Sequence, residues 1–119
     1  MLKEDLRQFY GSEQFYRICG DCVITEGVKY FGDKAEAYWL INDIVINCKM
    51  NKSLKDEDFV SVYCKKPENM AGIFVEYEDG NGNKLYQDYY PHSSLPDSDK
   101  GIGYNLWFVD NTVLLPSEY

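Results

Sequence analysis

The sequence predicts an α+β fold, with an antiparallel sheet of about four to six strands packed by one main helix and a short N-terminal helix. Two observations support this prediction. Apolar residues recur at helical spacing over 33–49, and the second half of the chain alternates short apolar stretches with turn residues. Because 45% of the 119 residues are hydrophobic, the chain can bury a core. We expect a single domain over 1–119.

Two short helices are expected before the main helix. Leu2, Leu6 and Phe9 fall at helical spacing and predict the N-terminal helix. Farther along the chain, the Thr25 hydroxyl can cap a single helical turn that ends at Gly32. Both segments are short, so the main helix is expected to organise the core.

The main helix is predicted to begin at Asp33, with the Glu36 carboxylate reaching back in a capping-box arrangement. One broad apolar face should pack on the sheet; it comprises Ala37, Tyr38, Leu40, Ile41, Ile44, Val45 and Cys48.

Ala35, Trp39 and Ile46 form a second, narrow apolar stripe that the core face does not need. Another part of the chain could cover this stripe. Alternatively, it could be a surface for a partner or for self-association into a homodimer.

The strands are predicted from apolar stretches between turn signals. They lie at 15–18, 22–25, 59–64, 72–78, 84–90, 104–109 and 112–115. Turn residues at 79–83 and at 110–111 predict two hairpins. Consecutive turn-linked strands favour antiparallel pairing.

Composition excludes several classes of function. A net charge of −8 argues against direct binding of nucleic acid and against an anionic membrane surface. No apolar run is long enough to span a membrane, and the charged N-terminus is unlike a signal peptide. These features predict a cytoplasmic protein whose cysteines are thiols.

The four cysteines are the candidate metal ligands. Cys19 and Cys22 form a CxxC motif, and a zinc site with Cys48 and Cys64 is the alternative to free thiols. The spacing is not specific to zinc because the other two cysteines stand singly. A redox role would need the CxxC at a helix start, whereas a strand is expected after it. We therefore expect no metal and no cofactor.

Asp79, Asn81 and Asn83 are spaced like the first ligands of a calcium loop. Such a loop needs glycine at its sixth position and glutamate at its twelfth, where this chain has Lys84 and Tyr90. A hairpin turn is therefore the favoured interpretation.

His92 is the single histidine, and it lies in a polar loop at 91–103 beside two serines. No motif for an oxyanion site or for orienting a base accompanies it. A small hydrolase-like or ligand- or metal-binding domain with a cleft near this loop is the alternative function. The sequence favours a non-enzymatic role with no catalytic residue.

Tyrosines interleaved with carboxylates on the predicted 72–78 and 84–90 strands indicate a binding surface. Tyrosine suits interfaces because it joins an apolar ring to a polar tip. Simple alternation should place five side chains on one face, with Tyr77 on the other: Glu76, Glu78, Tyr86, Asp88 and Tyr90. Together with Trp39, they are the candidate residues for binding a protein with a basic surface.

Several segments resemble one family of small bacterial and phage proteins that is classed only as a domain of unknown function. They are Leu6-Arg7-Gln8-Phe9, Gly11-Ser12-Glu13, Thr25-Glu26-Gly27-Val28-Lys29-Tyr30, Ala37-Tyr38-Trp39-Leu40, Asp79-Gly80-Asn81-Gly82 and Leu115-Pro116-Ser117-Glu118-Tyr119. The resemblance covers nearly the whole chain. It implies a free-standing domain of bacteria, phages or mobile elements, and it implies no activity or catalytic residue. We therefore expect an acidic protein-binding accessory or inhibitor protein that acts on a host factor.

Overall fold

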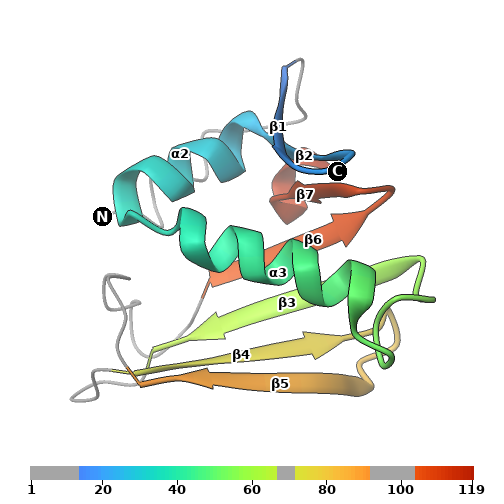
Figure 1. Cartoon of the computed structure of the whole chain (residues 1–119). Helices are drawn as coiled ribbons and strands as arrows, with labels where there is room; N and C mark the ends of the chain where they lie inside the picture. The colour runs from blue at the N-terminus through green and yellow to red at the C-terminus, as the bar shows by residue number, and fades with distance from the viewer. Residues whose placement is uncertain (1–13, 67–71, 92–103) are drawn as a thin grey trace.

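Two helices lie on one face of a seven-stranded sheet (Figure 1). The computed structural model describes residues 14–66, 72–91 and 104–119. The strands are β1 (Phe15–Cys19), β2 (Cys22–Thr25), β3 (Phe59–Lys65), β4 (Ile73–Glu78), β5 (Lys84–Tyr90), β6 (Tyr104–Val109) and β7 (Thr112–Leu114). The helices are α2 (Glu26–Ala35) and α3 (Tyr38–Met50), followed at the C-terminus by the short 3₁₀ helix η3 (Pro116–Glu118). The predicted N-terminal helix lies outside the described residues.

The α+β class is confirmed, but two details of the predicted sheet were wrong. The strand order is β1-β2-β7-β6-β3-β4-β5, so the sheet has seven strands where about four to six were expected. It is also mixed and not purely antiparallel, because β2 and β7 pair in parallel. Turn chemistry predicts hairpins between consecutive strands, and it carries no information on this pairing between distant strands.

The predicted main helix begins later than expected, because the chain breaks at Glu36. Glu36 has φ 51° and ψ 47°, a left-handed conformation that ends α2. Asp33 therefore lies inside α2, and the predicted capping box between Asp33 and Glu36 does not form. The Thr25 cap is confirmed, since its side chain accepts a hydrogen bond from the Val28 N–H.

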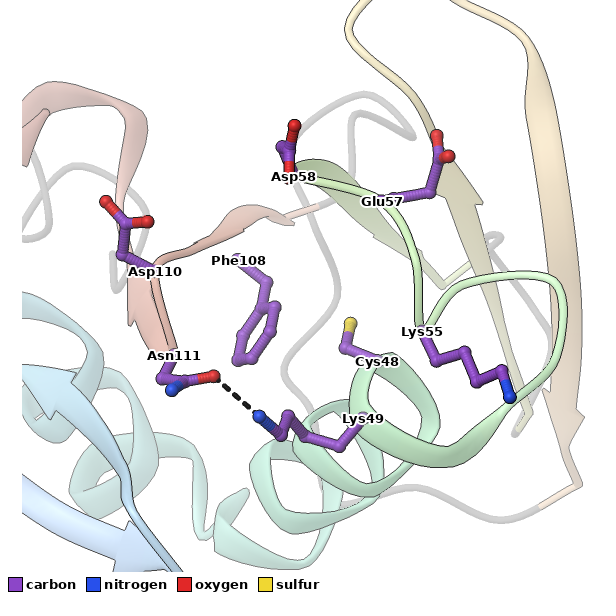
Figure 2. A pocket seen from close by; sticks show the side chains of 8 residues that line it. All are labelled: Cys48, Lys49, Lys55, Glu57, Asp58, Phe108, Asp110 and Asn111. Atoms are coloured by element: carbon purple, nitrogen blue, oxygen red, sulfur yellow. Dashed lines mark hydrogen bonds between the residues drawn. The ribbon is translucent and has the colours of Figure 1, made fainter.

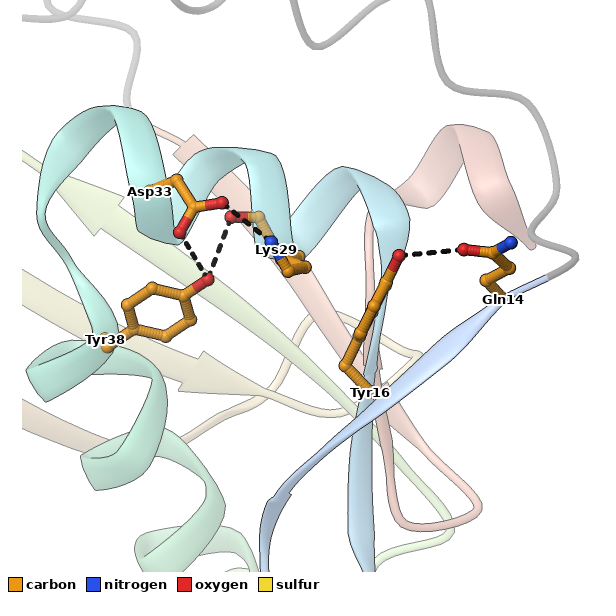
Figure 3. Close-up of polar contacts among 5 residues, drawn as sticks. All are labelled: Gln14, Tyr16, Lys29, Asp33 and Tyr38. Atoms are coloured by element: carbon orange, nitrogen blue, oxygen red, sulfur yellow. Dashed lines mark hydrogen bonds and ion pairs between the residues drawn. The ribbon is translucent and has the colours of Figure 1, made fainter.

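Gly32 lies within α2 and does not end it. A Cβ at this position would lie 2.9 Å from the Tyr38 ring, so glycine allows the first turn of α3 to pack closely on α2. The Tyr38 hydroxyl then donates to Asp33 at 2.7 Å, and it lies 3.3 Å from the Lys29 carbonyl (Figure 3). These contacts hold the two helices at the break.

The predicted core face of α3 is largely confirmed. Six of its seven residues are fully buried: Ala37, Leu40, Ile41, Ile44, Val45 and Cys48. Tyr38 is only partly buried. The second stripe is divided by the helix break, because Ala35 belongs to α2 and is buried, whereas Ile46 on α3 is 45% exposed. Trp39 is partly buried against the core.

The hairpin of β4 and β5 is confirmed, and the side chain of Asp79 organises its turn. One carboxylate oxygen accepts hydrogen bonds from the N–H groups of Asn81 and Asn83, and the other accepts from the Asn83 side chain. This carboxylate is a turn element, as the hairpin interpretation requires.

The second predicted hairpin turn joins β6 to β7. Asp110 and Asn111 have φ 50° and 58°, as a two-residue turn with two left-handed residues demands. The Asn111 carbonyl also accepts a hydrogen bond from the Val23 N–H at 2.9 Å. This turn therefore helps to place β7 beside β2.

Candidate functional site

The register of β4 and β5 divides the residues that were predicted to share one face. Ile73 pairs with Tyr90 and Tyr77 with Tyr86, so odd positions on β4 lie opposite even positions on β5. Tyr86, Asp88 and Tyr90 therefore lie on the helix side of the sheet together with Tyr77. Glu76 and Glu78 lie on the opposite face. The predicted single acidic face was wrong.

Four of the six candidate residues do come together, where α3 packs on the edge strand β5. We call this group, with two further residues from α3, the α3–β5 cluster: Trp39, Asp43, Asn47, Tyr86, Asp88 and Tyr90. Figure 1 shows α3 crossing in front of the sheet. The cluster is partly buried.

Matching repeats on the helix and on the strand explain the cluster. Trp39, Asp43 and Asn47 are spaced four residues apart, which on a helix places them on one face at intervals of about 6 Å. Tyr86, Asp88 and Tyr90 are spaced two apart, at intervals of about 6.6 Å on one strand face. The two rows therefore run side by side with nearly equal steps.

Specific contacts join the two rows. The rings of Trp39 and Tyr90 meet edge to face, with centroids 5.3 Å apart. The Tyr90 hydroxyl donates to Asp43 at 3.0 Å and lies 3.5 Å from Asp88. The Asn47 amide donates to Asp88 at 2.9 Å and lies 3.0 Å from the hydroxyl of Tyr77.

The electrostatics of the cluster leave two carboxylates close to neutral donors. Burial raises the pKa of Tyr90, and the hydrogen bond to Asp43 raises it further, so this tyrosine stays protonated. Burial likewise raises the pKa of Tyr77. Among the described residues, neither Asp43 nor Asp88 forms an ion pair with lysine or arginine. The cluster thus offers negative charge beside aromatic rings.

Asp43 and Asn47 were missed as site residues by the sequence analysis, which treated them as polar separators beside the apolar stripe. Their four-residue spacing with Trp39 was the available signal. That signal predicts a shared helix face, but it does not show which strand faces it.

On the opposite face, Glu76 is neutralised by two lysines. Its carboxylate pairs with Lys65 and, at 2.6 Å, with Lys84. These hydrogen-bonded lysines lower the pKa of Glu76, against the effect of burial. Although the sequence analysis placed Glu76 in the binding surface, its charge already has partners within the chain.

The lowered pKa of Glu76 predicts how stability depends on pH. Its contribution should be fully present above the ordinary glutamate pKa near 4.5 and should be lost as pH falls through the lower folded pKa. Glu76→Gln should flatten the decrease in unfolding free energy between about pH 5 and 2, measured by urea unfolding at each pH. The same change at exposed Glu57 should leave the slope as in the wild type. Equal slopes for all three proteins would contradict this assignment.

The cysteines carry free thiols, and they occupy different environments. Cys19 is partly exposed, and Cys22, Cys48 and Cys64 are buried. Burial raises the pKa of Cys48 and of Cys64 to about 12 in each case, so both stay protonated at neutral pH. No group of three or more His, Cys, Asp or Glu able to hold a metal ion occurs among the described residues, which include all four cysteines.

A small polar cleft of about 240 Å³ lies at the C-terminal end of α3 (Figure 2). Its lining combines two lysines, three carboxylates, an amide, a thiol and a ring: Lys49, Lys55, Glu57, Asp58, Asp110, Asn111, Cys48 and Phe108. Lys49 donates to the Asn111 side chain at 2.8 Å across it. The predicted alternative, a cleft near the loop at 91–103, falls outside the described residues except for Pro91, and His92 lies outside them as well.

The fold and the cluster define a two-layer α+β domain whose edge strand is fastened to a helix by carboxylates and tyrosines. The chain belongs to a family of unknown function, DUF6876, whose profile matches residues 1–119. No curated protein and no solved structure matches it. In the part of the chain that the structure describes, no helix is long and apolar enough to cross a membrane.

Proposed function

We propose that this chain is a non-enzymatic protein-binding module that recognises a basic surface on its partner through the α3–β5 cluster. The observation that carries the proposal is the pairing of Asp43 and Asp88 around the Tyr90 hydroxyl, beside the Trp39 ring. Carboxylates next to aromatic rings suit a lysine or arginine side chain, which can form an ion pair and also stack.

The charges of the chain support this choice of surface. The net charge of −8 favours association with a basic partner. Within the described residues, Glu76 already pairs with two lysines, whereas Asp43 and Asp88 are bound only by neutral donors. The cluster thus retains charge for a partner. The resemblance to bacterial and phage proteins suggests an accessory or inhibitor protein that acts on a host factor.

The experiment compares two variants of equal net charge. Asp43→Asn with Asp88→Asn removes two charges from the cluster, while its amide oxygens still accept the hydrogen bonds of Tyr90 and Asn47. Glu57→Gln with Asp58→Asn removes two charges from exposed positions elsewhere. Each immobilised protein is incubated with a bacterial lysate, and the recovered proteins are identified.

A partner should be retained by the wild type and by the Glu57/Asp58 variant and lost by the Asp43/Asp88 variant. Its association rate, measured with the purified partner, should fall as salt rises, because charge complementarity mainly accelerates encounter. Equal retention by both variants, or binding indifferent to salt, would exclude this surface.

Self-association is the other use of this region, through partly buried Trp39 and exposed Ile46. Sedimentation over a range of concentrations distinguishes the two modes. A mass that rises with concentration in the wild type and stays monomeric in Ile46→Ser would favour a homodimer over a separate partner.

A further inference from the structure

We propose that Cys19 and Cys22 form a reversible disulfide that closes the tip of the β1–β2 hairpin. The two cysteines are direct partners in the antiparallel ladder. Opposed residues in such a ladder have Cα atoms about 4.5–5.5 Å apart, and disulfides bridge Cα atoms about 4.4–6.8 Å apart. The backbone spacing of the hairpin therefore fits a disulfide without rearrangement of the strands.

The side chains also lie on the same side of the hairpin. Cys22 belongs to the buried core, and Cys19 packs against that core. The two-residue turn between them uses Gly20 with φ 56°, a conformation that glycine adopts readily and that keeps the strand ends close. A break in register between Arg17 and Cys19 brings Cys19, and not Ile18, opposite Cys22.

Exposure assigns the order of the chemical steps. Partly exposed Cys19 is the thiol that an external disulfide such as oxidised glutathione can reach. The Cys19 thiolate attacks one glutathione sulfur, forming a mixed disulfide and releasing one glutathione thiol. The Cys22 thiolate then attacks the Cys19 sulfur, forming the intramolecular disulfide and releasing the second glutathione thiol. Two protein thiols are thus oxidised while one glutathione disulfide is reduced.

The second step should limit the rate. Burial raises the pKa of Cys22, and the neighbouring Cys19 charge raises it further, so little Cys22 thiolate is present at neutral pH. Lys49 acts in the opposite direction. Formation of the disulfide should therefore accelerate as pH rises.

Peptide mapping tests the proposal directly, because trypsin separates the relevant cysteines. Cleavage after lysine and arginine yields 18–29 with Cys19 and Cys22, 35–49 with Cys48, and 56–65 with Cys64. The folded protein is treated with oxidised glutathione, denatured, alkylated with iodoacetamide and digested. We expect 18–29 without alkylation and lighter by two hydrogens, with 35–49 and 56–65 alkylated. Thiols per chain should fall from four to two.

The Cys19→Ser variant should keep three titratable thiols under the same treatment. Cys19 was chosen for substitution because it is partly exposed, so this change should preserve the fold. Three outcomes would overturn the proposal: full alkylation of 18–29, a disulfide that links 18–29 to 35–49, or a reaction that stops at the glutathione adduct.

Discussion

Ile41→Ala is expected to lower the free energy of unfolding by about 2–5 kcal/mol, enough to unfold a domain of ordinary stability. Ile41 is fully buried on the core face of α3, among side chains from both helices and the sheet. Truncation removes buried methyl groups and leaves a cavity that close-packed neighbours fill only in part. Urea unfolding followed by circular dichroism measures the effect.

Ile46→Ala is the matched control, because it makes the same chemical change on the same helix at a residue that is 45% exposed. It should shift the unfolding free energy by less than about 1 kcal/mol. Similar urea midpoints for the two variants would show that α3 does not pack on the sheet through Ile41.

Glu118→Ala is expected to cost about 2–4 kcal/mol, although Glu118 is charged and close to the C-terminus. Its buried carboxylate accepts hydrogen bonds from the Thr25 hydroxyl at 2.6 Å, the Gly27 N–H at 3.1 Å and the Leu115 N–H at 3.0 Å. Removing it leaves three donors without this acceptor, and it also removes a negative charge from the N-terminus of α2.

Two comparisons make this prediction specific. Glu118→Gln should cost less than Glu118→Ala, because its amide oxygen can still accept from Thr25 and Leu115 while the contact to Gly27 is lost. Ser117→Ala, at the exposed neighbouring position, should be nearly neutral. An order of stability other than Ser117→Ala, Glu118→Gln, Glu118→Ala would contradict the proposed role of the carboxylate.

The same interaction explains why a glycine follows the first residue of α2. A Cβ on Gly27 would lie 2.6 Å from the Leu115 side chain and 2.7 Å from the Glu118 carboxylate. The segment at the C-terminus can therefore pack against the start of α2 only because this position has no side chain. Residues 91 positions apart along the chain depend on each other here.

The sequence by itself determined the local elements. Alternating apolar residues between turn residues defined the strands, and a pair of left-handed residues, Asp110 and Asn111, marked the last hairpin. The buried face of α3 followed from helical periodicity, and the Thr25 cap followed from its side-chain chemistry. All of these signals act between residues close together in the chain.

Only the tertiary structure decided how distant elements meet. The sequence placed Glu76 with Tyr86 because both are even-numbered, yet alternation fixes faces within one strand and not between two. The register between β4 and β5 is set by the turn and by an irregularity at Tyr77, and it reverses that relation. The parallel pairing of β2 with β7 and the buried position of Glu118 are likewise products of long-range packing.

The α3–β5 cluster shows the same division. Its two rows are visible in the sequence as Trp39, Asp43 and Asn47 at helical spacing and as Tyr86, Asp88 and Tyr90 at strand spacing. Periodicity determines which side chains share a face, because it follows from the geometry of one element. Which faces contact each other depends on the burial of apolar surface summed over the whole domain, so only the assembled sheet and helices set the two rows side by side.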